Sequence, residues 1–194
     1  MEILLSVCIG VGLAAACGFR VFLPCLVLSA SSMAGLVELS PGFAWLAGWP
    51  ALACFAAATL VELAAYLVPW LDNLLDGLAG PLAVIAGILL SAAVIQDPDP
   101  LLKWSLVVIA GGGSAGAIQL MTTAWRGLSL AGTGGLANPL VSAGEAGGAV
   151  TLSLLAVFLP LAALLFFLLI AGLLFFGLQR LRRRRSKKTP GRKI

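Results

Sequence analysis

The stretch "ACGFRVFLP", residues Ala16–Pro24, places an arginine inside an apolar run that extends from Ile3 to about Leu28. A charged side chain near the centre of a bilayer costs roughly 2.5–17 kcal/mol, depending on how the cost is measured. Pro24 disfavours helix in the residue before it and clashes with the carbonyl four positions earlier, which belongs to Arg20. We therefore predict that the helix is interrupted between Gly18 and Pro24 and that the guanidinium of Arg20 faces the protein interior.

The composition of the chain is that of a membrane protein. Of its 194 residues, 61% are hydrophobic and only 10% are charged, against roughly 25% charged residues in soluble domains. A helix needs about 20 apolar residues to cross a bilayer, and the apolar runs are long enough. We predict an all-α transmembrane fold of about five spans, with six as the alternative and at least one interrupted helix. The predicted spans are Ile3–Leu28, Phe43–Val68, Leu78–Ile95, Leu101–Leu130 and Ala149–Leu178.

Basic residues are concentrated at the C-terminal end. Nine of the twelve Lys and Arg residues lie between Arg180 and Ile194, whereas all eight acidic residues lie before Arg180. Basic flanks of membrane spans stay in the cytoplasm. We therefore expect a single integral membrane domain, residues 1–179, and a basic cytoplasmic tail, residues 180–194. Because the tail directly follows an apolar helix, we expect it to contact anionic lipid head groups rather than nucleic acid.

Five spans and a cytoplasmic C-terminus place the N-terminus outside the inner (plasma) membrane. On this topology the loop "QDPDPLLK" (residues 96–103) lies in the cytoplasm, whereas "PWLDNLLDG" (69–77) and most of "AGTGGLANPLVSAGE" (131–145) lie outside. A count of four or six spans would instead place both ends in the cytoplasm. The internal loops carry too few basic residues to choose between these counts.

The sequence offers little for metal or covalent chemistry. It contains no histidine, its four cysteines fall within predicted spans without a CxxC pair, and P-loop, nucleophile-elbow and HExxH motifs are missing. Cysteine in such surroundings behaves as a small apolar side chain. We therefore expect no metal, no cofactor and no enzymatic activity.

Eight polar residues stand out against the apolar background as candidates for a substrate-binding site. Arg20 and Glu62 lie inside predicted spans, where an ionisable group indicates a functional site with a partner. The predicted partner of Arg20 is Glu62. Arg126 is a second arginine in a predicted span, and guanidinium groups suit carboxylate and phosphate. The full set is Arg20, Glu62, Asp72, Asn73, Asp76, Arg126, Asn138 and Glu145.

Several interpretations of these features stay open. Arg20 and Glu62 can form a structural ion pair, the two arginines can bind an anion or polar solute, or the carboxylates can serve a cation or proton path. The breaks at Gly111–Gly113 and Pro160 also allow two interpretations. Glycine in a membrane helix lets two helices pack closely, and a broken helix can line a wet cavity.

Two short matches point to internal repetition. "CGFRVF" around Arg20 and "TAWRGL" around Arg126 each place an aromatic residue directly before arginine, and their offset of 106 residues predicts an inverted repeat. "GLAGPL" (77–82) and "GLANPL" (135–140) agree at five of six positions, at an offset of 58 residues. The two offsets cannot describe one duplication.

Five motifs occur in the order that is typical of one family. They are "GLAAACGFRVFLP" (12–24), "SPGFAWLAGWPAL" (40–52), "VELAAYLVPWLDNLLD" (61–76), "IAGGGSAGAIQ" (109–119) and "TGGLANPLVSAGE" (133–145). The chain from about Met1 to about Leu178 resembles the prokaryotic multi-pass family catalogued as domain of unknown function 4126. The resemblance implies an integral membrane protein of the cell envelope, and it implies no particular activity.

The residues favour a small transporter or channel-like protein for a small polar or anionic solute. In this interpretation Arg20 and Arg126 contact the anion, Glu62 is a counter-charge or coupling group, and Asp72, Asn73 and Asp76 form an external vestibule. The alternative is a non-transporting membrane scaffold, or a lipid-interacting or assembly protein. Because so few helices make a thin wall around a pathway, we expect a homo-oligomer in either case.

Overall fold

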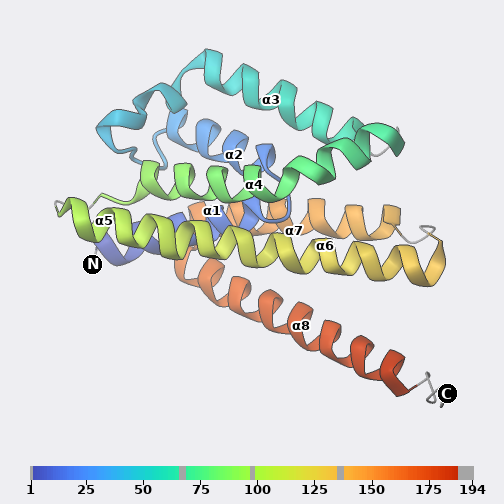
Figure 1. Ribbon diagram of the computed structural model, residues 1–194. Helices are drawn as coiled ribbons and strands as arrows, with labels where there is room; N and C mark the ends of the chain where they lie inside the picture. The colour runs from blue at the N-terminus through green and yellow to red at the C-terminus, as the bar shows by residue number, and fades with distance from the viewer. Residues whose placement is uncertain (1, 66–68, 97–98, 135–137, 188–194) are drawn as a thin grey trace.

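The protein is described here by a computed structural model, which covers residues 2–65, 69–96, 99–134 and 138–187. Every regular element in these residues is helical (Figure 1). The prediction of an all-α fold is confirmed. The elements are α1 (Glu2–Cys17), α2 (Phe22–Met33), η1 (Pro41–Ala47), α3 (Trp49–Ala64), α4 (Pro69–Val94), α5 (Pro100–Leu106), η3 (Val107–Gly112), α6 (Gly113–Thr133), α7 (Asn138–Phe158) and α8 (Pro160–Lys187).

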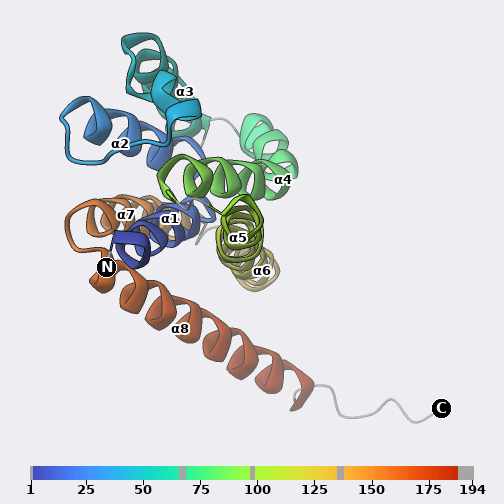
Figure 2. The same ribbon diagram turned by 90° about the vertical axis from the view of Figure 1, so that its left-hand side faces the viewer.

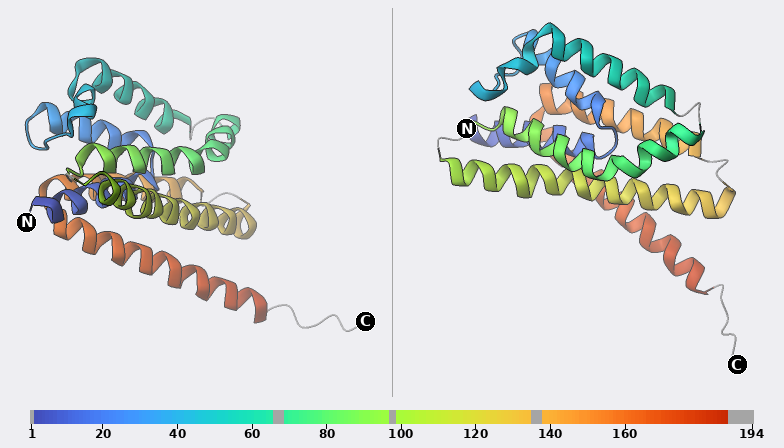
Figure 3. Two further views of the ribbon diagram at one scale, coloured as in Figure 1. Left: turned by 60° about the vertical axis from the view of Figure 1, so that its left-hand side comes forward. Right: turned by 45° about the horizontal axis from the view of Figure 1, so that its top comes forward.

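The first two helices form a hairpin rather than a span. α1 has 16 residues and α2 has 12, so at 1.5 Å per residue they are about 24 and about 18 Å long, shorter than the hydrocarbon core of about 30 Å. α1 runs into the bundle and α2 returns toward the end from which α1 came (Figures 1 and 3). The predicted single span Ile3–Leu28 is therefore wrong, although the predicted interruption after Gly18 is confirmed.

The turn of the hairpin depends on a close approach to α6. A Cβ atom on Gly18 would lie 2.5 Å from the carbonyl oxygen of Ala115 and 2.6 Å from the Cβ of Ile118. A larger residue therefore has no room here unless the tip or α6 shifts. Pro24 does not break a helix, because it lies in the first turn of α2. The N–H groups of a first turn have no partner within the helix, so proline is tolerated there.

The predicted fifth span also divides into two helices. α7 ends at Phe158 and α8 begins at Pro160. A residue before proline is disfavoured in a helix, whereas proline suits the first helical position. Residues 149–178 are therefore the end of one membrane-length helix and most of the next, instead of a single span.

These two departures offset each other in the number of crossings. Four helices are long and apolar enough to cross a membrane, and the number is up to five if η1 and α3, which meet at a bend of 64°, act as one span. The candidate crossing segments are α4, α5–α6, α7 and α8, with η1–α3 as the fifth. The start of α1 and the end of α8 lie at opposite ends of the bundle (Figure 1), as a five-span topology requires.

The sides of the loops, however, are the reverse of those predicted. Because the hairpin does not cross, the start of α4 and the start of α7 lie at the same end of the bundle as the end of α8 (Figure 1). The start of α5 lies at the opposite end. The segment 69–77 and most of 131–145 were predicted opposite the basic tail. That prediction is wrong for the described residues at the starts of α4 and α7.

α1 forms the centre of the bundle. Figure 2 shows it surrounded by α4, α6, α7 and α8, with α3 outermost, beyond α2 and α4. Its second half is small and fully buried, with Leu13, Ala14, Ala15 and Ala16 at 0% exposure. α8 tilts away from the bundle, and only 6% of its 160–177 stretch is buried. Long apolar helices with exposed apolar faces indicate a multi-pass membrane protein.

The glycines of the fourth predicted span serve close packing. Pro100–Gly132 is a single stretch of helix with a π-helical segment at Val107–Gly112. Gly111 is buried against Ser91 of α4, and a Cβ on Gly112 would lie 3.0 Å from the Cγ1 of Ile88. The helix is continuous there, so the packing interpretation of Gly111–Gly113 holds for its first two glycines.

Candidate functional site

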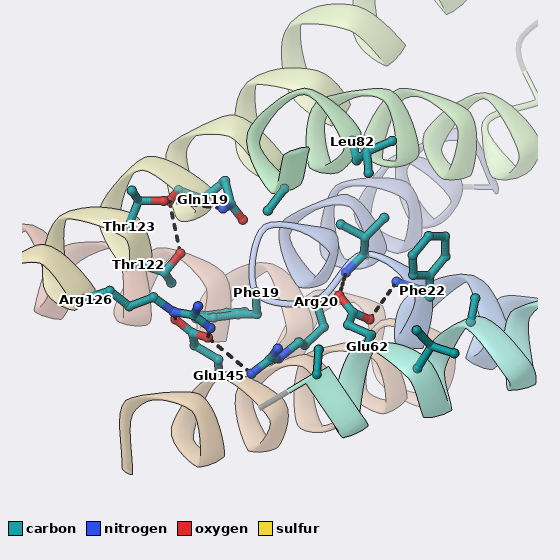
Figure 4. A pocket seen from close by; sticks show the side chains of 15 residues that line it. Phe19, Arg20, Phe22, Glu62, Leu82, Gln119, Thr122, Thr123, Arg126 and Glu145 are labelled. Carbon is teal, nitrogen blue, oxygen red and sulfur yellow. Dashed lines mark hydrogen bonds and ion pairs between the residues drawn. The ribbon is translucent and has the colours of Figure 1, made fainter. Parts of the chain in front are cut away.

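Arg20 lies in the turn between α1 and α2, and it is only 4% exposed. Its side chain reaches across to α7, where Nη2 donates to the carbonyl oxygen of Ser142 at 3.1 Å. The same Nη2 lies 3.3 Å from Oε2 of Glu145 (Figure 4). The predicted burial of Arg20, with its guanidinium toward the protein interior, is confirmed. Glu145 was not predicted as a partner of Arg20. Glu62, the predicted partner, also attracts Arg20 electrostatically.

Glu145 also binds the second arginine. Arg126 of α6 donates from Nε to Oε1 of Glu145 at 3.0 Å and from Nη2 to Oε2, which makes the contact bidentate. Glu145 is 4% exposed, and the side chain of Arg126 is 15% exposed. Two parallel hydrogen bonds from one guanidinium are among the stronger polar contacts in proteins. We call Arg20, Arg126 and Glu145 the arginine–glutamate cluster.

The cluster lies well inside the helical bundle. Arg126 precedes the end of α6 by seven residues, and Glu145 follows the start of α7 by seven residues. At 1.5 Å per residue, both lie about 10 Å from that end of the bundle. This is the end at which α8 also finishes (Figure 1).

Glu62 of α3 binds the backbone of the hairpin tip. Its Oε1 accepts from the N–H of Val21 at 2.8 Å, and its Oε2 accepts from the N–H of Phe22 at 3.2 Å. These N–H groups begin α2 and have no partner within the helix. An acidic side chain at a helix N-terminus is favoured by the helix dipole. Glu62 thus caps α2 and ties α3 to the tip.

A cavity of about 310 Å³ opens beside these residues. Its polar lining comes mainly from the hairpin tip, α6 and α7, and its apolar walls come mainly from the tip, α3 and α4 (Figure 4). Of the described residues that line it, those with a charge are Arg20, Glu62, Arg126 and Glu145. The remaining lining residues are Phe19, Val21, Phe22, Ala58, Val61, Ala65, Ala79, Leu82, Gln119, Thr122 and Thr123.

A second cavity, of about 370 Å³, lies among α6, α7 and α8. Phe19, Thr122 and Glu145 line both cavities, so these three side chains stand at the boundary between the two. The second cavity is otherwise almost entirely apolar, with Trp125, Ile170 and Leu174 among its lining residues.

The other predicted site residues are placed less fully. Asp72, Asn73 and Asp76 fall in the first turns of α4, and Asn138 is the first residue of α7, but their side chains lie outside the described residues. The vestibule was predicted opposite the basic tail, whereas the starts of α4 and α7 lie at the end of the bundle where α8 finishes.

Three polar residues of the cavity escaped the sequence analysis. Gln119, Thr122 and Thr123 share one face of α6 with Arg126, and Gln119 Nε2 lies 3.4 Å from Thr123 Oγ1. Positions i, i+3, i+4 and i+7 fall on one face of a helix. That spacing, from Gln119 to Arg126, is the signal in the sequence, although three of the four side chains are uncharged.

The geometry defines the class of the protein: a multi-pass helical membrane protein in which a helical hairpin carries a buried arginine to a cavity inside the bundle. The chain belongs to the family described as Domain of unknown function (DUF4126), whose profile matches residues 7–180. The resemblance seen in the motifs is thereby confirmed, and the match ends where the basic tail begins. No curated protein and no solved structure matches the chain.

Proposed function

We propose that this protein is a small transporter or channel-like protein of the inner membrane, and that its solute is a small anion held by Arg20 and Arg126. The observation that carries the proposal is the convergence of two arginines, from the hairpin tip and from α6, at the wall of one cavity. Guanidinium groups present their donors in a fork that matches carboxylate and phosphate oxygens. Glu145 occupies this fork in the structure, in the manner expected of a bound anion.

The alternative function is that of a non-transporting scaffold, in which the cluster only holds helices together. The contact of Glu145 with both arginines favours that alternative, because a compensated cluster can be purely structural. The cavity favours transport. Protein interiors have few voids larger than a water molecule, so a space of about 310 Å³ beside four charged side chains is unexpected in a scaffold.

The proposal includes an orientation and partners. Basic flanks stay in the cytoplasm, so we place the end of α8 inside and the start of α1 outside. The tail then contacts anionic lipid head groups, and several copies associate to enclose the pathway. The activity proposed is binding and passage of a solute rather than enzymatic chemistry.

Flux measured in proteoliposomes tests this function. We expect vesicles that contain the full-length protein to take up radiolabelled chloride or methanesulfonate faster than empty vesicles. Arg126→Gln, which removes the bidentate guanidinium, should reduce the uptake at least tenfold, since one such contact is worth about 1.5–3 kcal/mol.

Lys103→Gln is the matched control for the loss of a positive charge. Lys103 lies in the last turn of α5, where its Nζ donates to Ser40 Oγ at 3.1 Å, and it is not among the residues that line the cavity. This variant should retain wild-type uptake. Uptake by wild type that is no faster than uptake by empty vesicles would favour the scaffold. Uptake by Arg126→Gln equal to that of wild type would contradict the role proposed for Arg126.

A further inference from the structure

Glu145 occupies the place that the proposed solute must take. Both of its carboxylate oxygens contact guanidinium nitrogens, and it is almost fully buried. It also stands at the boundary between the two cavities, with Phe19 and Thr122. An anion that takes up the same donor atoms, Nε and Nη2 of Arg126 and Nη2 of Arg20, must displace this carboxylate, and a path to the second cavity runs past it.

The charges at the site constrain how the displacement can occur. Among the side chains that the structure describes, the charged ones that line the first cavity are Arg20, Arg126, Glu62 and Glu145, and their formal charges sum to zero. A monovalent anion would leave this buried site with one uncompensated negative charge, which is strongly unfavourable where the dielectric constant is low. A proton bound at the same time restores neutrality.

We propose that Glu145 takes up this proton, so that each monovalent anion enters together with one H⁺. This inference rests on the proposed anion site and names its coupling ion. The proton comes from water and binds a carboxylate oxygen of Glu145. The hydrogen bonds from Nε and Nη2 of Arg126 then pass to the anion. When the anion leaves, Glu145 releases the proton and pairs with the arginines again.

Glu145 is a better proton acceptor for this step than Glu62. Both oxygens of Glu62 accept backbone N–H bonds from the start of α2, and an incoming anion at the arginines leaves those bonds in place. Glu145 is the carboxylate that loses its cationic partners when the anion binds. The groups that face Glu145 are Arg20 from the hairpin tip, Arg126 from α6 and, farther away, Glu62 from α3.

Calorimetry on the purified full-length protein tests the coupling directly. Binding of methanesulfonate, which keeps its charge over this range, is measured between about pH 5.5 and about pH 7.5. If one proton binds with each anion, the affinity should fall about tenfold per pH unit as the pH rises, for as long as Glu145 is ionised in the anion-free protein. Titrations of wild type in two buffers of different ionisation enthalpy count the protons taken up, without any substitution.

Two glutamine variants assign the proton to a residue. Glu145→Gln is neutral at every pH, so it should bind methanesulfonate with an affinity that is independent of pH. Glu38→Gln is the matched control, because Glu38 is exposed and lies outside both cavities. It should keep the tenfold slope of the wild type.

The outcomes separate this inference from the proposed function. If wild type binds methanesulfonate with an affinity that does not change with pH, or takes up no proton, the coupling is refuted while the anion site stands. If Glu145→Gln keeps the wild-type slope, the proton is bound elsewhere and the inference is again refuted. If wild type binds neither methanesulfonate nor chloride at any pH, the anion site itself is refuted.

Discussion

Glu145 links two positive charges that come from different parts of the chain, one from the hairpin tip and one from α6. A buried ion pair contributes little net stability compared with an apolar pair of similar size, because both charges lose their hydration. Removing one partner is different, since it strands the other charge in a low-dielectric interior. A single substitution in the cluster should therefore lower the free energy of unfolding strongly, whereas replacing both partners should lower it less.

A double-mutant cycle tests the pairing. Arg20→Ala and Glu145→Ala should each lower the free energy of unfolding by about 3–5 kcal/mol, and the double variant should lose clearly less than the sum. The measurement is thermal or denaturant unfolding of the purified protein. The same cycle with Arg20→Ala and Glu62→Ala should show a smaller coupling, because Glu62 bonds the backbone of Val21 and Phe22. A larger coupling to Glu62 than to Glu145 would contradict the geometry.

At the scale of single residues, the sequence predicts the burial of Arg20 but not its contact with Glu145. Burial follows from the cost of a charge among apolar residues, and any buried arginine needs compensation. Glu62 and Glu145 are chemically the same, however, and only the packing of α7 against the tip brings Glu145 within 3.3 Å. The competing donors at the start of α2 are backbone groups, which the sequence does not distinguish from those of any other residue.

At the scale of elements, the hairpin is held in place by the contact between its tip and α6. Gly18 has no room for a side chain, because a Cβ would meet the backbone of Ala115 at 2.5 Å. Backbone cannot move aside as a flexible side chain can, so the tip would have to shift. Since Arg20 is two residues away, a shift would also disturb its contacts with Ser142 and Glu145.

Gly18→Ala should therefore destabilise the protein by about 1–3 kcal/mol, the usual penalty for overpacking. The control is Gly113→Ala in α6, where a Cβ would meet nothing within 4 Å. Alanine is a better helix former than glycine by about 1 kcal/mol, so the control should be neutral or slightly stabilising. Unfolding transitions of the two variants and wild type give the comparison. If Gly18→Ala were as stable as Gly113→Ala, the tip would not pack against α6 as described.

The interruptions show how far sequence signals reach at this scale. Proline and glycine mark positions where a helix can end, but not whether it does. Pro24 is accommodated in a first turn, Pro160 starts a new helix, and Gly111 lies in a helix that continues. Arg20 and Arg126, which the inverted repeat would superpose, occupy unlike positions, a turn and the interior of α6. Each outcome depends on the neighbouring helix, which the sequence alone does not show.

At the scale of the whole molecule, the predicted number of spans agrees with the structure partly because two errors offset each other. Apolar length identifies membrane segments well, but Ile3–Leu28 is long enough for one span and folds as two short helices. Ala149–Leu178 was counted as one span but contains parts of two helices. One predicted span is lost and another is gained, so the number of spans stays the same. The start of α1 and the end of α8 therefore lie at opposite ends of the bundle, as predicted. The loops between the spans, however, lie at the opposite end of the bundle from the one predicted.

The position of Glu38 tests this topology. Glu38 follows α2, so a hairpin places it on the side of the N-terminus, whereas a span would place it on the side of the basic tail. In a chain whose four cysteines are replaced by serine or alanine, Glu38→Cys and Asp99→Cys should both react with a membrane-impermeant maleimide applied outside intact cells, because basic flanks keep the tail in the cytoplasm. Arg180→Cys should react only after the membrane is opened. Labelling of Glu38→Cys together with Arg180→Cys, and apart from Asp99→Cys, would mean that α1 and α2 cross as one span and that Arg20 does not lie at the tip of a hairpin.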